Sequence, residues 1–165
     1  MKCNAAMTAA LSMLRLPDKL SDDLASIAEE GFFQRNGCEF LNFFKSSSIA
    51  VSLDYLQDRT GYECYVNSIH IDDYVDLNWL GEALLFANRL IEHWLARSSP
   101  ELLQVIVSCD EFGAMVKAHV IRAGESWLRE NLDEYDDPVL LARSDSADLI
   151  ELLTQLKNNG ATFQQ

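Results

Sequence analysis

Hydrophobic residues recur with helical spacing in four segments of the chain. The clearest segment runs from about residue 77 to 97, where apolar residues follow one another in steps of three and four and so share one helix face. Further apolar side chains widen that stripe, and Pro100 marks its end. Shorter stretches with the same period cover residues 5–15, the residues after Ser21 and those from about 145 onward. The pattern predicts four helices, the longest of which lies across a sheet.

Elsewhere the period of the hydrophobic pattern changes to two, which is typical of strands. The predicted strands are residues 48–55, 62–71, 102–108, 116–122 and 138–142. Turns at Asp58–Gly61 and Asp110–Gly113 join the first four into two hairpins. The element order is then α-α-β-β-α-β-β-β-α, and tight hairpins favour antiparallel pairing. We therefore predict an α+β fold with an antiparallel sheet of about five strands packed with helices.

One stretch before the first predicted strand is rich in phenylalanine. Its aromatic residues are Phe32, Phe33, Phe40, Phe43 and Phe44. We interpret this stretch as a core-lining helix or loop, and a ligand pocket lined by phenylalanines is the alternative.

Length and composition fit one folded unit. The chain has 165 residues, 48% of them hydrophobic, which favours a single domain over residues 1–165 with frayed last residues. Its four cysteines are scattered without paired spacing, as expected of reduced thiols in a cytosol. The first residues are too polar for a signal peptide or a membrane span. These features together predict a soluble, cytoplasmic protein.

Charge gives the strongest indication of function. The formal net charge is −13, and residues 125–151 alone contribute nine carboxylates against two basic side chains. An acidic surface with aromatic anchors attracts basic proteins and repels nucleic acid and anionic lipid. The predicted partner-binding residues are Glu125, Trp127, Asp133, Glu134, Tyr135, Asp136 and Asp137, with Asp72 and Asp73 as a second acidic group. The alternatives are a solvated face that keeps the protein soluble, aromatic residues that belong to the core, and helix-dipole compensation by the second group.

The sequence contains no recognisable catalytic or cofactor motif. A phosphate-binding glycine loop, a nucleophile elbow and an H-E-x-x-H helix are all missing. His70 and Asp72 would share one side of a strand, but a metal site usually needs three or four ligands. We therefore predict no catalytic, cofactor or metal site.

The second half of the chain resembles a known class of proteins. The segments that carry the resemblance are Ser108–Gly113, Val116–Arg122, Gly124–Leu128 and Leu132–Val139, a strand, a turn, a strand and an acidic loop within residues 102–148. In this pattern the chain is similar to the small acidic immunity proteins of bacterial polymorphic toxin and contact-dependent growth inhibition systems.

The resemblance implies a protein that binds and neutralises a cognate toxin. The toxin would be basic and nuclease-like, because nuclease active sites attract phosphate. The acidic patch would then occlude the active or substrate-binding surface of the toxin. This interpretation gives the chain a protein partner, no nucleic-acid or membrane partner, and a monomeric or weakly dimeric state.

Two alternatives remain open from the sequence. A secretion chaperone is also small, acidic and cytoplasmic, and it would use the long apolar helix as a dimer face and the phenylalanine-rich stretch as a groove. An enzyme is the third alternative, and it depends only on His70 and Asp72.

Overall fold

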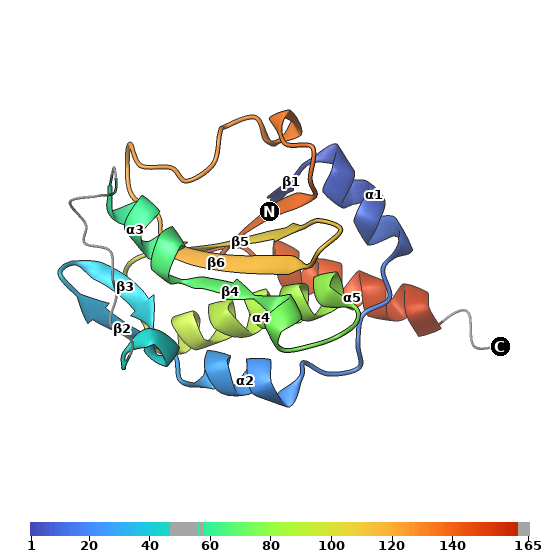
Figure 1. Cartoon of the computed structure of the whole chain (residues 1–165), viewed down its shortest axis with the longest axis horizontal. Coiled ribbons are helices and arrows are strands. Elements are labelled where there is room, and N and C mark those ends of the chain that lie inside the picture. Colours follow the sequence, from blue (N-terminus) through green and yellow to red (C-terminus); the bar gives the residue numbers. More distant parts are fainter. Residues whose placement is uncertain (47–55, 57, 162–165) are drawn as a thin grey trace.

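The computed structural model of the chain describes residues 1–46, 56 and 58–161. Its centre is a five-stranded antiparallel sheet in the order β1-β7-β5-β6-β4 (Figure 1). The strands are β1 (Lys2–Cys3), β4 (Ser68–His70), β5 (Leu103–Cys109), β6 (Ala114–Val120) and β7 (Val139–Arg143). The predicted α+β class with an antiparallel sheet of about five strands is confirmed.

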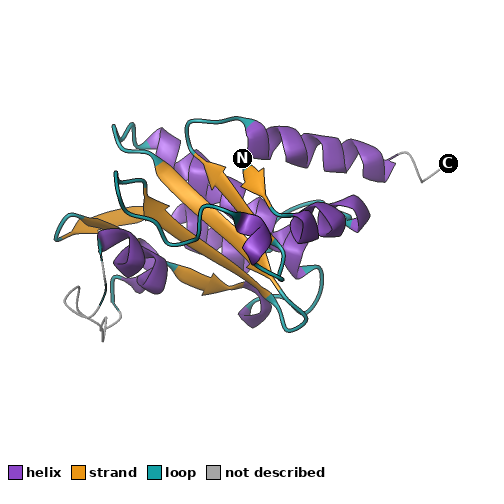
Figure 2. Ribbon diagram, turned by 90° about the horizontal axis from the view of Figure 1, so that it is seen from above, coloured by secondary structure: helices purple, strands orange, loops and turns teal. Residues whose placement is uncertain are grey.

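Helices cover one face of this sheet. The described α-helices are α1 (Ala5–Met13), α2 (Asp22–Glu29), α3 (Arg59–Val66), α4 (Trp79–Ala96) and α5 (Asp148–Ala161). α4 lies across the sheet with α2 and α5 on the same side, as Figures 1 and 2 show. The helix predicted for residues 77–97 is α4. Its apolar stripe lies in the main core, where Leu84, Leu90 and Trp94 are buried. None of the described helices combines the length and apolarity needed to span a bilayer.

The alternation of side chains gives the sheet two different faces. Val105, Val107, Val116 and other members of the same alternation pack in the main core with α4. The opposite face, which we call the outer face, carries the intervening residues of the same strands. α3 and the connection between β6 and β7 cover part of it (Figure 2). Side chains of the sheet itself can reach a ligand only from this outer face, because the other face packs against helices in the main core.

The prediction of a turn and a strand for residues 58–71 is wrong in the first half of that segment. Residues 59–66 form α3, and only Ser68–His70 pair as a strand. Asp58 accepts a hydrogen bond from the Gly61 N–H at 2.7 Å and so caps the helix. Tertiary packing overrides the strand propensity of this segment, because Glu63 and Cys64 are fully buried against other elements.

The phenylalanine-rich stretch is a β-hairpin, where we expected a core-lining helix or loop. β2 (Phe32–Arg35) pairs antiparallel with β3 (Cys38–Leu41), and the short 3-10 helix η1 (Asn42–Phe44) follows. Asn36 and Gly37 form its turn with positive φ angles of 54° and 72°, the conformation that an Asn-Gly pair tolerates best. Phe40 is buried in a small apolar cluster with Tyr62 of α3.

Two predictions concern residues that the structure does not describe. The predicted strand at residues 48–55 lies outside the described residues, and so do the last residues, 162–165, which we expected to be frayed.

A buried ion pair joins the hairpin, α3 and the sheet. The Glu63 carboxylate is fully buried and accepts hydrogen bonds from the backbone N–H groups of Glu39 and Val120, both at 2.7 Å. The Arg122 guanidinium binds both oxygens of the same carboxylate, at 2.6 and 3.0 Å. Every lone-pair direction of the carboxylate therefore meets a donor, which is the condition under which a buried charge is tolerated.

Replacing Glu63 with Gln should destabilise the fold strongly. The substitution keeps the shape of the side chain but leaves the Arg122 charge in a buried site without its counter-ion. Breaking a buried ion pair in this way costs about 3–5 kcal/mol of unfolding free energy, measurable by urea denaturation. Glu134→Gln is the matched control, because it breaks an exposed pair with Arg129 and should cost about 1 kcal/mol or less. Equal losses in the two variants would contradict the role given to Glu63.

Acid should destabilise the protein partly through His119. This side chain is buried, with its Nδ1 2.9 Å from the Val120 carbonyl oxygen and its Nε2 3.0 Å from the Gln104 amide nitrogen. Burial lowers the pKa of His119 below its ordinary value of about 6.5, against the opposing effect of the Val120 hydrogen bond. As the pH falls below that value, the unfolded chain takes up a proton before the folded one does. Stability is therefore lost with falling pH in this range.

The measurement is the unfolding free energy of the wild type and of His119→Gln between pH 7.5 and 5. The variant should lose less stability on acidification, because its side chain takes up no proton. His70→Gln, which removes an exposed imidazole, is the control. Identical pH slopes for the wild type and His119→Gln would contradict the prediction.

Candidate functional site

The connection between β6 and β7, residues 121–138, crosses the outer face of the sheet, and we call it the acidic loop (Figure 1). It includes the short 3-10 helix η4 (Leu132–Glu134). The buried Asn4 side chain fixes its far end: Nδ2 donates to the carbonyl oxygens of Tyr135 and Asp137 at 3.1 and 2.7 Å. The Oδ1 atom of Asn4 accepts from the N–H groups of Met7 and Val139. With Arg122 held by Glu63, the loop is anchored at both ends.

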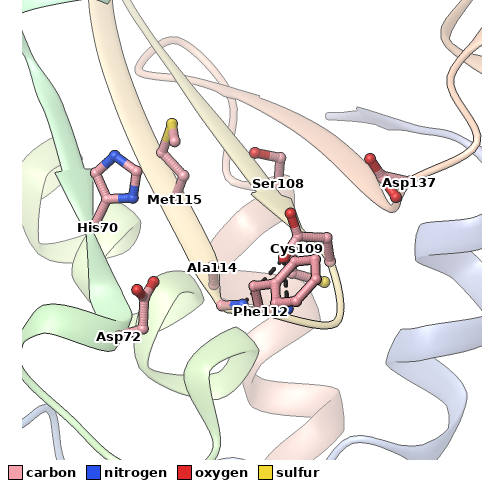
Figure 3. Close-up of a pocket in the computed structure, with 10 residues that line it drawn as sticks. His70, Asp72, Ser108, Cys109, Phe112, Ala114, Met115 and Asp137 are labelled. Atoms are coloured by element: carbon pink, nitrogen blue, oxygen red, sulfur yellow. Dashed lines mark hydrogen bonds between the residues drawn. The ribbon is translucent and has the colours of Figure 1, made fainter.

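A hollow lies beside the acidic loop, at the end of the β5–β6 hairpin, and we call it the hairpin hollow (Figure 3). Its volume is about 220 Å³. Its lining comes from three separate parts of the chain and consists of His70, Asp72, Ser108, Cys109, Asp110, Phe112, Gly113, Ala114, Met115 and Asp137.

Strand register brings these residues together. His70 of β4 pairs with Met115 of β6, and Met115 pairs with Ser108 of β5, so the three side chains form one row on the outer face. The hairpin turn closes the end of this row: Asp110 Oδ1 accepts hydrogen bonds from the N–H groups of Phe112 and Gly113 at 2.8 and 3.0 Å. Gly113 has no side chain, and a Cβ atom there would collide with the Asp72 carboxylate.

The hollow has an acidic rim and an apolar lining. Asp72, Asp110 and Asp137 reach it from three segments, and none of them forms an ion pair within the described part of the chain. Burial, together with the charges of Asp110 and Asp137, raises the pKa of the Cys109 thiol, so this group stays protonated and uncharged at neutral pH. The Phe112 ring is 77% exposed at the tip of the hairpin. Such a hollow suits a cationic group carried on an aliphatic stem.

The structure gives no support to a metal in this hollow. Within the described residues, no three His, Cys, Asp or Glu side chains are placed so that they could hold a metal ion. His70 and Asp72 both line the hollow, but the prediction that they share one side of a strand is wrong, because β4 ends at His70 and Asp72 belongs to the short 3-10 helix η3 (Ile71–Asp73). No hydrogen bond joins these two described side chains (Figure 3).

Three of the predicted partner-binding acids have partners within the chain. Glu125 accepts a hydrogen bond from the Thr60 N–H at 2.9 Å, at the first turn of α3. Although burial opposes it, hydrogen bonding to Thr60 and the nearby arginines lower the pKa of Glu125. Asp133 accepts from the Ala5 N–H at 2.9 Å at the start of α1, and Glu134 pairs with Arg129. These acids stabilise helix ends and the loop itself.

The two aromatic residues of the loop differ in their packing. Tyr135 packs in an apolar cluster on the outer face with Ile106 and Leu132, and its hydroxyl accepts a hydrogen bond from the Arg129 N–H. Trp127 is 39% exposed and lies with its ring 5.4 Å from the Lys117 ammonium group. Tyr135 therefore holds the loop against the sheet, whereas Trp127 still presents aromatic surface to solvent.

The other predicted acids lie on the surface. Asp72 and Asp137, 65 positions apart in sequence, line the same hollow, while Asp73 and Asp136 are exposed next to them in the chain. Sequence reasoning missed Asp110 and Phe112 as site residues. The predicted Asp110–Gly113 turn could have indicated these two residues, because a hairpin turn lies at the exposed end of its two strands.

The chain is similar to one protein family and to a protein of Pasteurella multocida. A family model described as the Uncharacterized protein PM0498 family matches residues 2–158. The Uncharacterized protein PM0498 of Pasteurella multocida (strain Pm70) is 30% identical over 118 residues, which cover 65% of this chain and 73% of the relative. No solved structure matches the chain.

Trp127→Ala should cost less stability than the same change at a core tryptophan. Trp94 is buried in the main core, and its replacement by Ala should lower the unfolding free energy by about 3–5 kcal/mol. Trp127 keeps part of its ring in solvent, so its replacement removes fewer contacts. Urea denaturation of both variants checks this prediction, and equal losses would make Trp127 a core residue.

Proposed function

The chain belongs to the Uncharacterized protein PM0498 family, and we propose that it acts as an immunity protein in a bacterial cytoplasm. In this proposal it binds a basic, nuclease-like toxin domain and occludes the active or substrate-binding surface of that domain. The observation that carries the proposal is the meeting of Asp72, Asp110 and Asp137, from three separate segments, around one hollow whose lining contains no Lys or Arg.

The charge distribution supports a basic partner. The uncompensated carboxylates of the hollow add to a formal net charge of −13, which speeds the encounter with a positively charged surface and opposes binding to nucleic acid. The carboxylates that the acidic loop uses for its own structure still contribute to this long-range field.

The size of the hollow supports a protein ligand. Small-molecule sites commonly enclose about 300–1,000 Å³, whereas the hairpin hollow measures about 220 Å³. This space suits one Lys or Arg side chain of a partner. The aliphatic part of that side chain would contact Met115 and Phe112, and its charged end would reach the carboxylates at the rim.

The alternatives have less support from the arrangement of the described residues. A chaperone that uses the long helix as a dimer face would need its apolar side free, but Leu84, Phe86 and Leu90 of α4 are buried under the sheet. Phe40 is likewise buried within the chain. The proposal assigns no catalytic role to His70 and Asp72, because no hydrogen bond joins these two described side chains into an acid–base pair.

The test begins with isolation of the bound protein from the native host under crosslinking. Association of the purified partner is then measured by stopped flow for the rim variant Asp72→Asn, Asp136→Asn and Asp137→Asn, which neutralises two rim carboxylates and the neighbouring exposed Asp136. Asp110 is kept, because its carboxylate holds the hairpin turn. The control variant Asp23→Asn, Glu29→Gln and Glu151→Gln removes the same charge from α2 and α5, on the other side of the sheet.

Neutralising the rim should weaken binding more than the control does. Exposed charges contribute about 0.2–1 kcal/mol each, so the rim variant should bind roughly 3- to 100-fold more weakly, with a larger effect at low salt. The control should change the association rate only slightly, through net charge. If both variants behave alike, or if the partner is acidic, the proposed binding site is wrong.

A further inference from the structure

α4 and α5 lie on the same side of the sheet (Figures 1 and 2). A second hollowed surface runs along the seam between these two helices, and we call it the helix seam. Two hollows of about 410 and 350 Å³ lie next to each other on it. Asn88, Glu92 and Ile150 line both, so the two hollows form one continuous surface. The acidic loop and the hairpin hollow lie on the outer face, across the sheet from this seam.

The helix seam exposes apolar side chains of α4 and α5 that are not buried in the core. Leu149 and Leu153 of α5 are buried in the main core, but Ile150 is 50% exposed between the two hollows. Leu95 of α4 is 56% exposed and lines the smaller hollow. A protruding isoleucine next to an open hollow supplies both halves of a self-complementary contact, as a twofold interface requires.

The charges of the helix seam also favour a second copy of the chain. Its lining contains three basic side chains, Lys19, Arg89 and Lys157, and three acidic ones, Asp18, Glu92 and Asp145. Two copies that each carry −13 repel one another over most of their surfaces. The seam is electrically balanced, and Lys19, Arg89 and Asp145 pair within the chain with Asp22, Glu92 and Arg143, so a second copy meets little repulsion at this surface.

We propose that the helix seam is a contact between two copies of this chain, in which Ile150 of each copy enters the smaller hollow of its partner. The contact is isologous and leaves the outer faces of both copies free. It does not depend on the proposed immunity function, because it involves neither the acidic loop nor the hairpin hollow.

The test is the mass of the purified protein by sedimentation equilibrium. Over about 1 μM to 1 mM, the range of weak to moderate protein affinities, the mass should rise from 18.6 kDa towards twice that value. Added salt should strengthen the dimer, because it screens the repulsion between two acidic chains. Ile150→Glu should weaken dimerisation at least tenfold, because it places a charge in the apolar hollow. Leu95→Glu, at the same hollow, should weaken it as well.

Leu77→Glu is the matched control, since Leu77 is an apolar residue of the same size that is 80% exposed and does not line the seam. It should leave the dimerisation constant within about twofold, and circular dichroism shows whether each variant is folded. A mass of 18.6 kDa at every concentration would overturn the proposal. So would a dimer that is insensitive to both seam variants, or a monomer whose seam variants lose binding to a different protein.

Discussion

The buried charge of Glu63 is the constraint on which the arrangement of this molecule depends. One carboxylate receives donors from the β2–β3 hairpin, from the end of β6 and from the Arg122 side chain. Since a buried carboxylate is costly unless all its oxygens are satisfied, these three elements must be in place at the same time. Arg122 is also the second residue of the acidic loop, so the interaction that closes the core fixes where the loop begins.

The parts of the fold that follow from local pattern could be predicted from the sequence. The α4 helix, the β5–β6 hairpin and the final helix each carry a clear period, and each forms as predicted. Residues 59–66 could not be predicted, because Tyr62, Cys64 and Val66 favour a strand and the helix depends on Asp58 and on the buried Glu63. The β2–β3 hairpin could have been predicted, because the Asn36-Gly37 pair is a strong turn signal. The surrounding phenylalanines led us to interpret the stretch as a core-lining helix or loop instead.

The candidate site could be predicted only in its composition. The density of acids in residues 125–151 is visible in the sequence, but the sequence does not say which acids are engaged by the fold. Asp133 and Glu125 bind backbone N–H groups at helix starts, an arrangement that depends on segments more than 60 positions away. The meeting of Asp72, Asp110 and Asp137 depends on the antiparallel register of β4, β6, β5 and β7, which alternation alone does not specify.

Asn4 has a consequence for the order in which the molecule is built. Its side chain binds Tyr135, Asp137 and Val139, and neighbouring Cys3 pairs with Leu140, so these contacts span about 130 or more positions of sequence. Contacts of such long range form late in folding, because closing a large loop of chain costs conformational entropy. A ribosome makes Asn4 about 130 residues before its partners. The acidic loop therefore takes its final shape only after residues 135–139 have been made, and a product truncated before them lacks the contacts that hold the loop on the outer face.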